Sequence, residues 1–300
     1  MPPTTDSIRE ANVRYHDLAA EHYDSKWGIG YDEVAQAQVT GKLRKALGAL
    51  PATGFDRGLE IGAGTGYFSL NLMRAGLLRS AVASDISPGM LAALSESAAS
   101  LGVPVETVAC EASSLPFDDE SFDLVFGHAV LHHLPDLAGS FREFRRVLAP
   151  GGVVAFCGEP SRYGDRLSAV PKRGALALAP VWRALIGARS RNGNGHVHGE
   201  EEDQLEQVVD VHAFTPADLS THANAAGFRD VHVGGEELAA SLFGWANRTL
   251  EATAEPSEVP WAWRVYAYRG YLLLQRLDRS LLEPHLPAGL FYNLLVSARA

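Results

Sequence analysis

Cysteine, long apolar runs and positive charge are all scarce in this chain. Only 2 cysteines occur among 300 residues, Cys110 and Cys157, both at ends of expected central strands. That number is too small for a disulfide framework and fits a reducing compartment. No window approaches the roughly 18 apolar residues of a membrane helix, and the first residues lack a basic segment followed by an apolar stretch. We therefore expect a cytoplasmic protein with no membrane span.

The charge balance is acidic, with 26 Lys and Arg against 36 Asp and Glu and a formal net charge of −10. Nucleic-acid binding depends on clustered basic residues that displace counterions, so we expect no nucleic-acid partner. The one local basic cluster, Arg142, Arg145 and Arg146, lies on an expected helix and is interpreted as a solvated face. With 46 % hydrophobic residues, the chain has enough apolar material for one large core and for insertions.

Strand and helix signals alternate through the middle of the sequence. The expected strands are short apolar runs at 57–62, 80–85, 104–109, 122–127 and 152–158. The expected helices between them cover 66–76, 88–100 and 137–148. This alternation predicts an α/β fold with a doubly wound, mostly parallel sheet that carries helices on both faces.

The most informative segment is a glycine turn at the end of the first expected strand, Gly58-Leu59-Glu60-Ile61-Gly62-Ala63-Gly64-Thr65-Gly66. Glycines let the backbone turn sharply and approach a ligand without an intervening Cβ atom. A dinucleotide site usually has the spacing G-x-G-x-x-G, whereas this turn has G-x-G-x-G directly after an acidic residue. The segment predicts a nucleotide-type cofactor site at the carboxyl end of the strand.

A second acidic residue stands where a ribose acceptor is expected. Asp85 ends the next strand 19 residues after Gly66, close to the spacing of about 20 in nucleotide-binding folds. An ionised carboxylate at this place can accept hydrogen bonds from both ribose hydroxyls. The alternative is that Asp85 caps the following helix, a role for which Ser87-Pro88 is an equally good signal.

Four motifs, taken together and in order, resemble those of class I S-adenosylmethionine-dependent methyltransferases. They are the glycine turn with Glu60, the strand ending in Asp85, the pair Glu111-Ala112, and the run from Gly127 to Asp136. The resemblance covers mainly residues 55–158 and is closest to the small-molecule group that includes ubiquinone and menaquinone biosynthesis methyltransferases. It implies a seven-stranded, Rossmann-like fold and S-adenosyl-L-methionine as the cofactor.

The resemblance also implies roles for particular residues. Asp85 would receive the ribose, and Glu111-Ala112 the adenine amino group, although the family acid is more often Asp at that position. His128 would face the methionyl part, and Tyr23 would fold over the cofactor or, alternatively, pack against the sheet. The full set expected to bind the cofactor is Tyr23, Glu60, Gly62, Ala63, Gly64, Gly66, Asp85, Ile86, Met90, Glu111, Ala112 and His128.

Histidines supply the candidate catalytic residues. His132 and His133 either brace the start of a helix or provide a general base, and Tyr15, Glu159 and His232 are further candidates for that role. Adjacent histidines point in different directions, so we expect no metal there. His196 and His198 beside the acidic run 200–203 are the alternative metal site, in a polar loop.

The rest of the chain is expected to surround this core. Helices at 7–27 and 32–49 precede it, a helix opening at Thr215-Pro216 and a strand at 229–233 follow, and 291–298 forms the last strand. We expect the two insertions to form a helical lid; a dimer interface or an extra helical layer is the alternative. The expected divisions are 1–54 (N-terminal helical cap), 55–158 (cofactor-binding core), 159–213 (insertion), 214–235 (core helix and strand six), 236–288 (helical lid) and 289–300 (last strand).

These observations predict an enzyme that transfers a methyl group from S-adenosylmethionine to O, N or C of a small metabolite. The aromatic insertions favour a hydrophobic or aromatic acceptor, typical of secondary metabolism, and a homodimer is possible. A catalytically silent cofactor-binding or partner-binding module shares every motif and stays open. A dinucleotide oxidoreductase would need the third glycine one place later.

Overall fold

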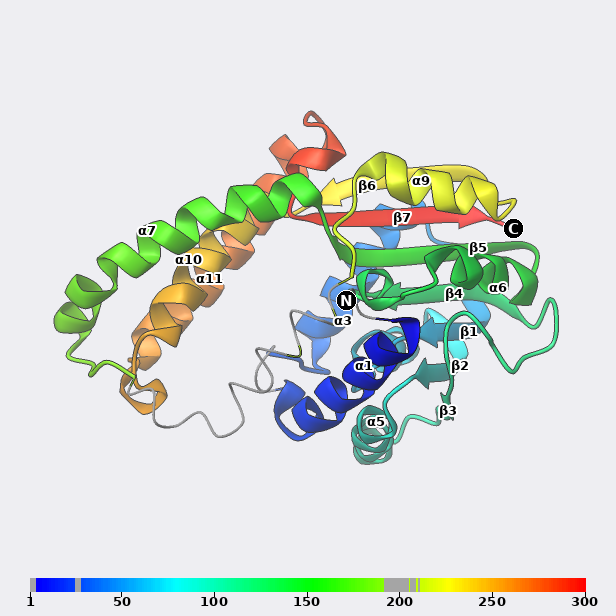
Figure 1. Cartoon of the computed structure of the whole chain (residues 1–300), viewed down its shortest axis with the longest axis horizontal. Helices are drawn as coiled ribbons and strands as arrows, with labels where there is room; N and C mark the ends of the chain where they lie inside the picture. Colours follow the sequence, from blue (N-terminus) through cyan, green and yellow to red (C-terminus); the bar gives the residue numbers. More distant parts are fainter. Residues whose placement is uncertain (1–3, 25–27, 192–204, 206–208, 210) are drawn as a thin grey trace. The chain divides into compact units, whose positions relative to one another are not determined.

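The computed structural model describes residues 4–24, 28–191, 205, 209 and 211–300, and it forms two units (Figure 1). Unit 1 comprises Met1–Glu159, Glu200–Gly234 and Leu295–Ala300, and unit 2 comprises Pro160–Gly199 and Gly235–Leu294. Among the described residues, no helix is both long enough and apolar enough to cross a membrane.

A seven-stranded sheet in the order β3-β2-β1-β4-β5-β7-β6 forms the centre of unit 1. Its strands are β1 (Phe55–Ile61), β2 (Leu78–Asp85), β3 (Glu106–Ala109), β4 (Phe122–His128), β5 (Leu148–Pro160), β6 (Arg229–Glu236) and β7 (Asn293–Arg299). The ladders from β3 through β5 are parallel, and Figure 1 shows β7 running opposite to β6. The expected doubly wound, mostly parallel sheet is confirmed.

Helices cover both faces of this sheet because its strands are apolar on both sides. In unit 1 they are α1 (Thr5–Ala19), η1 (Ala20–His22), α3 (Glu33–Leu47), α4 (Tyr67–Arg74), α5 (Pro88–Leu101), η2 (Leu131–His133), α6 (Leu137–Val147) and α9 (Pro216–Ala225). Apolar residues of α3, α4 and α5 pack on one face of the sheet. On the other face, Phe141 and Phe144 of α6 pack against Phe156 of β5.

Two sequence expectations about strands need correction. Cys110 follows β3, which is an edge strand rather than a central one, and only Cys157 of β5 lies in the sheet centre. The fifth strand, expected at 152–158, begins at Leu148, so Pro150-Gly151-Gly152 lies inside it, where the register with β4 shifts between Phe122 and Leu124. Gly151 has a φ of +80°, so the strand bends there without strain.

Unit 2 is helical, with α7 (Arg162–Ile186), α10 (Ala239–Ala252), η4 (Pro256–Glu258), α11 (Trp261–Leu277), η5 (Asp278–Leu282) and η6 (Ala288–Leu290). The helical character of both insertions was expected, but the extent of the first helix was not. This helix, α7, has 25 residues although Pro171 and Pro180 lie inside it and proline normally ends a helix. Within this unit, the buried carboxylate of Asp278 accepts hydrogen bonds from the amides of Ala239 and Ala240 at the start of α10.

Glu60 attaches α4 to the sheet. Its side chain is buried near the end of β1, and its Oε2 atom accepts a hydrogen bond of 3.0 Å from the amide of Ser69 in the first turn of α4. Burial raises the pKa of Glu60 to about 8, with a further contribution from the nearby charge of Asp85. At neutral pH the group is therefore mainly protonated and acts as a hydrogen-bonding anchor rather than as a charge.

We expect Glu60→Gln to change how stability depends on pH. Burial raises the pKa of Glu60 from its ordinary value of 4.5 to about 8 in the folded state. Between these pH values the folded state holds a proton that the unfolded state has lost, so the free energy of unfolding falls as pH rises. The group contributes a slope of up to about 1.4 kcal/mol per pH unit. Urea unfolding from about pH 5 to about pH 8 should show this slope in the wild type and a smaller one in the variant, since glutamine keeps an acceptor for Ser69.

The matched control is Glu106→Gln on β3, an exposed carboxylate. It should leave the pH dependence of unfolding unchanged. Equal slopes in the wild type and in Glu60→Gln would show that Glu60 ionises normally in the folded state.

Candidate active site

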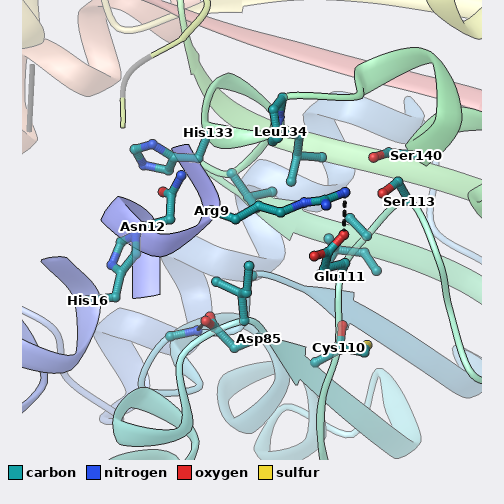
Figure 2. Close-up of a pocket in the computed structure, with 18 of the residues that line it drawn as sticks. Arg9, Asn12, His16, Asp85, Cys110, Glu111, Ser113, His133, Leu134 and Ser140 are labelled. Atoms are coloured by element: carbon teal, nitrogen blue, oxygen red, sulfur yellow. Dashed lines mark hydrogen bonds and ion pairs between the residues drawn. The ribbon is translucent and has the colours of Figure 1, made fainter. Parts of the chain in front are cut away.

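A cavity of about 850 Å³, counting the part open to solvent, lies at the carboxyl ends of the parallel strands of unit 1 (Figure 2). This is where doubly wound folds place ligands. Its wall is formed by the turns after β1, β2, β3 and β4 and by side chains from α1 and the segment that follows it.

The glycine turn after β1 forms one side of the cavity. Gly62, Gly64 and Gly66 all have positive φ values of 61°, 52° and 88°, which favour glycine. A Cβ atom on Gly62 would overlap the side chain of Val130, so no larger residue fits between these two walls. A Cβ atom on Gly64 would have only Tyr23 nearby, at 4.0 Å, so the backbone at this glycine faces open cavity.

Asp85 is held at the end of β2 by two main-chain amides. Its Oδ2 atom accepts from Gly64 at 2.8 Å, and its Oδ1 atom accepts from Ser87 at 2.9 Å. Each carboxylate oxygen has two lone pairs, so each retains capacity for one further donor, such as a ribose hydroxyl. The helix-capping alternative for Asp85 is not what the structure shows, because the side chain of Ser87 caps α5 through the amide of Met90 at 3.1 Å.

Tyr23 lies beside Asp85 in the wall of the cavity. Burial raises the pKa of Tyr23 to about 12, and the nearby carboxylates of Asp85 and Asp24 add to this shift. The phenol is therefore neutral at physiological pH. It can act as a hydrogen-bonding group or as an apolar surface against a ligand, but not as a base.

Glu111 faces the cavity from the loop after β3, and α1 reaches it from the opposite side (Figure 2). A guanidinium nitrogen of Arg9 lies 2.6 Å from Oε2 of Glu111, with each side chain about one third exposed. A partly exposed ion pair of this kind stabilises the fold weakly. The ion pair matters for the position of Arg9. It holds the Arg9 side chain across the mouth of the cavity, next to Glu111, the residue expected to receive adenine.

His133 forms part of the upper wall in Figure 2, close to His16 of α1, with ring centroids 5.5 Å apart. Its Nδ1 atom lies 3.1 Å from the carbonyl oxygen of Val209. A carbonyl only accepts, so Nδ1 carries the proton and Nε2 carries the lone pair. Burial lowers the pKa of His133 well below its usual value, and His132 and His16 lower it further. The imidazole is therefore neutral at physiological pH.

His132 and Glu159 have a different function from that of His133. The carboxylate of Glu159, fully buried at the end of β5, accepts from the amides of Val130, Leu131 and His132 at 2.9, 3.0 and 3.2 Å. The same carboxylate lies 2.9 Å from Nδ1 of His132. Glu159 thus holds η2 in place behind the cavity wall. This geometry corresponds to the bracing role considered for His132 in the sequence.

The structure brings most of the expected site residues together. Those that line the cavity are Tyr23, Gly62, Gly64, Asp85, Ile86, Glu111, Ala112, His128 and His133. Glu60, Ala63, Gly66, Met90 and His132 lie behind its surface, in contact with the helices or strands that support it. Of the other candidate bases, Glu159 holds backbone amides, Tyr15 is buried in α1, and His232 lines a separate cavity around the start of β1.

Residues from α1 are the main part of the site that the sequence did not indicate. Arg9, Asn12 and His16 line the cavity together with Ser113, Leu134 and Asp136. The spacing of 9, 12 and 16 places these three side chains on one face of a helix, and this polar face is the signal that was available. Only the tertiary structure shows that it faces a cavity rather than solvent.

Among the residues that the structure describes, no group of three or more His, Cys, Asp or Glu side chains is placed so that it could hold a metal ion. His196, His198 and the acidic run 200–203, considered as an alternative metal site, lie outside the described residues.

Comparison with known proteins agrees with this geometry. Residues 59–156 match the family described as methyltransferase domain. A malonyl-[acyl-carrier protein] O-methyltransferase of Methylococcus capsulatus is 33 % identical over 68 % of this chain and 68 % of its own. A demethylmenaquinone methyltransferase of Mycolicibacterium gilvum is 34 % identical over 63 % of this chain and 73 % of its own. The chain belongs to the S-adenosylmethionine-dependent methyltransferases.

Other similarities are more limited. The chain spans 46 % of a malonyl-[acyl-carrier protein] O-methyltransferase of Halorhodospira halophila, at 38 % identity over 48 % of this chain. Among solved structures, a Haemonchus contortus phosphoethanolamine N-methyltransferase 2 has a TM-score of 0.60 at 17 % identity, covering 98 % of this chain and 60 % of its own. The [4+2]-cyclase SpnF has a TM-score of 0.58 at 17 % identity, covering 99 % and 97 %. At this identity these structures show a shared fold alone.

For an S-adenosylmethionine-dependent methyltransferase, we expect Asp85→Ala to weaken binding of S-adenosylhomocysteine at least about tenfold, or about 1.4 kcal/mol, because a charged acceptor is lost. Isothermal titration calorimetry measures this affinity.

The control for Asp85→Ala is Asp123→Ala. Asp123 also accepts from two backbone amides, those of Asp56 and Arg57 at 2.7 and 2.9 Å, but it lies at the other cavity. It should lower the melting temperature without changing the affinity. Unchanged affinity in Asp85→Ala, or an equal loss in both variants, would remove Asp85 from the cofactor site.

Proposed function

We propose that this protein transfers a methyl group from S-adenosylmethionine to the oxygen of a small acceptor with an acidic hydroxyl, such as a phenol or an enol. The observation that carries the acceptor class is the neutral imidazole of His133 in the cavity wall. The observations that support the donor are the glycine turn and the carboxylates of Asp85 and Glu111 around one cavity.

These residues fit the cofactor. Asp85 has acceptor capacity for the two ribose hydroxyls, and Glu111 has a second oxygen besides the one that contacts Arg9. The open backbone at Gly64 and the aromatic ring of Tyr23 would enclose the remainder, with His128 on the far side. When bound, S-adenosylmethionine supplies a methyl group already activated by a sulfonium. The protein then has to orient the acceptor and exclude water.

His133 supplies a general base, which S-adenosylmethionine does not provide. A hydroxyl acceptor must lose its proton during the transfer, and a neutral imidazole with its lone pair on Nε2 can accept it. The carbonyl of Val209 fixes the ring orientation and the tautomer. Because the pKa of His133 is depressed, it is a weak base, and a weak base matches an acceptor whose hydroxyl is relatively acidic. This matching favours phenols and enols over aliphatic alcohols.

The names of the relatives do not point to one acceptor class, since the malonyl-[acyl-carrier protein] O-methyltransferases among them are named for an acyl group on a carrier protein. The relatives also include demethylmenaquinone methyltransferases and a 27-O-demethylrifamycin SV methyltransferase of Amycolatopsis mediterranei, which is 34 % identical over 51 % of this chain. A cytoplasmic location, a homodimer and the absence of nucleic-acid binding stay predictions from the sequence. The lid role of the helical insertions stays a prediction as well.

The test of this function is transfer of a radiolabelled methyl group to a panel of phenolic, enolic, carboxylate and amine acceptors. We expect His133→Gln to lower kcat for a phenolic acceptor about 100-fold or more, the usual contribution of a general base. The affinity for S-adenosylhomocysteine should stay within about threefold, because the interaction lost is with the acceptor proton. With the wild type, kcat/KM should be flat as pH falls through about 6.5, because the pKa of His133 lies well below that value.

The control for His133→Gln is His232→Gln at the other cavity, which should leave kcat unchanged. A carboxylate acceptor has no proton to lose at neutral pH and should be methylated equally by wild type and variant. Full activity of His133→Gln on phenols would contradict the acceptor class, and no transfer to any class by wild type would contradict methyl transfer itself.

A further inference from the structure

Helix α7 of unit 2 has two apolar faces, of which only one is used for packing. The buried face consists of small residues and one tryptophan: Gly164, Ser168, Ala175, Ala179 and Trp182. It packs within unit 2, where α7 contacts α10 and where Trp182 lies 5.1 Å from Trp263 of α11 between ring centroids. A helix in a solvated layer normally carries polar residues on its other side.

The other side of α7 instead carries a row of large apolar side chains, here named the apolar stripe. Its members are Tyr163, Leu167, Val170, Leu178, Val181 and Leu185, with exposed fractions from 40 % to 81 %. At about 100° per residue, all six lie within a sector of about 80°. The stripe extends about 33 Å along the helix at 1.5 Å per residue. The stripe has two parts, Tyr163 to Val170 and Leu178 to Leu185, with Gly174 between them in the same sector. Exposed large apolar side chains grouped on one side of a helix mark a binding surface.

Basic residues lie along the edge of the apolar stripe that faces away from the buried face. Arg162, Arg166 and Arg173 are exposed and occupy one sector next to the stripe, within about 40° of one another. From 160 to 191 the sequence has seven basic residues, Arg162, Arg166, Lys172, Arg173, Arg183, Arg189 and Arg191, and a single acidic one, Asp165. This local excess of positive charge contrasts with the net charge of −10 of the whole chain.

The far end of unit 2 adds an aromatic residue suited to an interface. Trp261 at the start of α11 is 76 % exposed. The segment after α7 is tied to the segment that precedes α11, because the backbone amide and guanidinium of Arg189 both bond to the carboxylate of Glu258 at 2.7 Å. Tryptophan concentrates at membrane–water interfaces, where its ring is partly apolar and partly polar.

The charge pattern distinguishes between possible occupants of the stripe. A second copy of the chain that packed α7 against α7 would bring basic residues together, with one acidic residue in the whole segment to offset them. A small metabolite is far shorter than the stripe. A lipid bilayer with anionic headgroups is an extended surface that is apolar inside and negatively charged outside. It matches both the apolar stripe and the arginines beside it.

We propose that α7 docks the protein onto a bilayer that contains anionic phospholipid. The apolar stripe enters the boundary between headgroups and acyl chains, and Arg162, Arg166 and Arg173 contact the phosphate groups. The helix lies in the plane of the surface, in agreement with the finding that no described helix could span a membrane. The inference stands apart from methyl transfer, since neither donor nor acceptor takes part in it.

The test is flotation of the full-length chain with vesicles of phosphatidylcholine alone or mixed with phosphatidylglycerol. We expect binding to the mixed vesicles and its loss at high salt, because part of the attraction is electrostatic. Leu178→Gln combined with Leu185→Gln should weaken binding at least about tenfold, since the apolar contact scales with buried area. Arg162, Arg166 and Arg173 changed together to Gln should abolish the preference for phosphatidylglycerol.

The matched control combines Leu273→Gln with Leu281→Gln, two leucines of unit 2 that are 66 % and 57 % exposed but lie outside α7. This variant should bind vesicles as the wild type does, and thermal unfolding should show all variants folded. Equal binding by the stripe variant and the wild type would overturn the proposal. A second result would also overturn the proposal: the wild type does not bind vesicles but is a dimer in sedimentation equilibrium, and the stripe variant is a monomer. The apolar stripe would then be a self-association surface.

Discussion

Buried carboxylates hold the irregular backbone at the carboxyl ends of the strands, and the cavity depends on them. A sheet satisfies its own amide groups, but the turns that leave it do not, and a buried amide without an acceptor costs about 1–3 kcal/mol. Glu60 accepts from the first turn of α4, Asp85 from two turns beside the cavity, and Glu159 from three consecutive amides around η2. Asp85 and Glu159 therefore hold the turns that form the cavity wall, and Glu60, which is mainly protonated, holds the helix beside it.

The fold could be predicted because its determinants are local in the sequence. Buried parallel strands are short apolar runs, and the glycine turn needs positive φ values that glycine adopts without strain. Asp85 at the end of β2 and Glu111 after β3, both selected from the sequence, line the same cavity. In contrast, the length of α7 could not be predicted, because Pro171 and Pro180 lie inside this continuous helix and proline normally ends one.

The roles of Glu60 and Glu159 could not be predicted because they depend on contacts between distant parts of the chain. Glu159 lies 27 to 29 residues after the amides that it holds, and nothing near it in the sequence indicates that distance. Glu60 precedes the glycine turn like a ligand-binding acid, yet its carboxylate faces α4. Similarly, the different roles of His132 and His133 become visible only when the register of η2 is known. His132 contacts Glu159 and braces η2, whereas His133 lines the cavity.

The segment from α1 to Asp24 connects these elements across the mouth of the cavity. It contacts the turns after three neighbouring strands: Asp24 accepts from Thr65 at 2.5 Å, Asp17 accepts from Gly89 at 2.9 Å, and Arg9 pairs with Glu111 at 2.6 Å. All three contacts are polar and none is deeply buried, so each is weak on its own. If adenine binds Glu111 as proposed, the cofactor shares this carboxylate with Arg9 of α1. In that arrangement cofactor binding and the position of this segment would be energetically coupled, since a change in one would alter the contacts of the other.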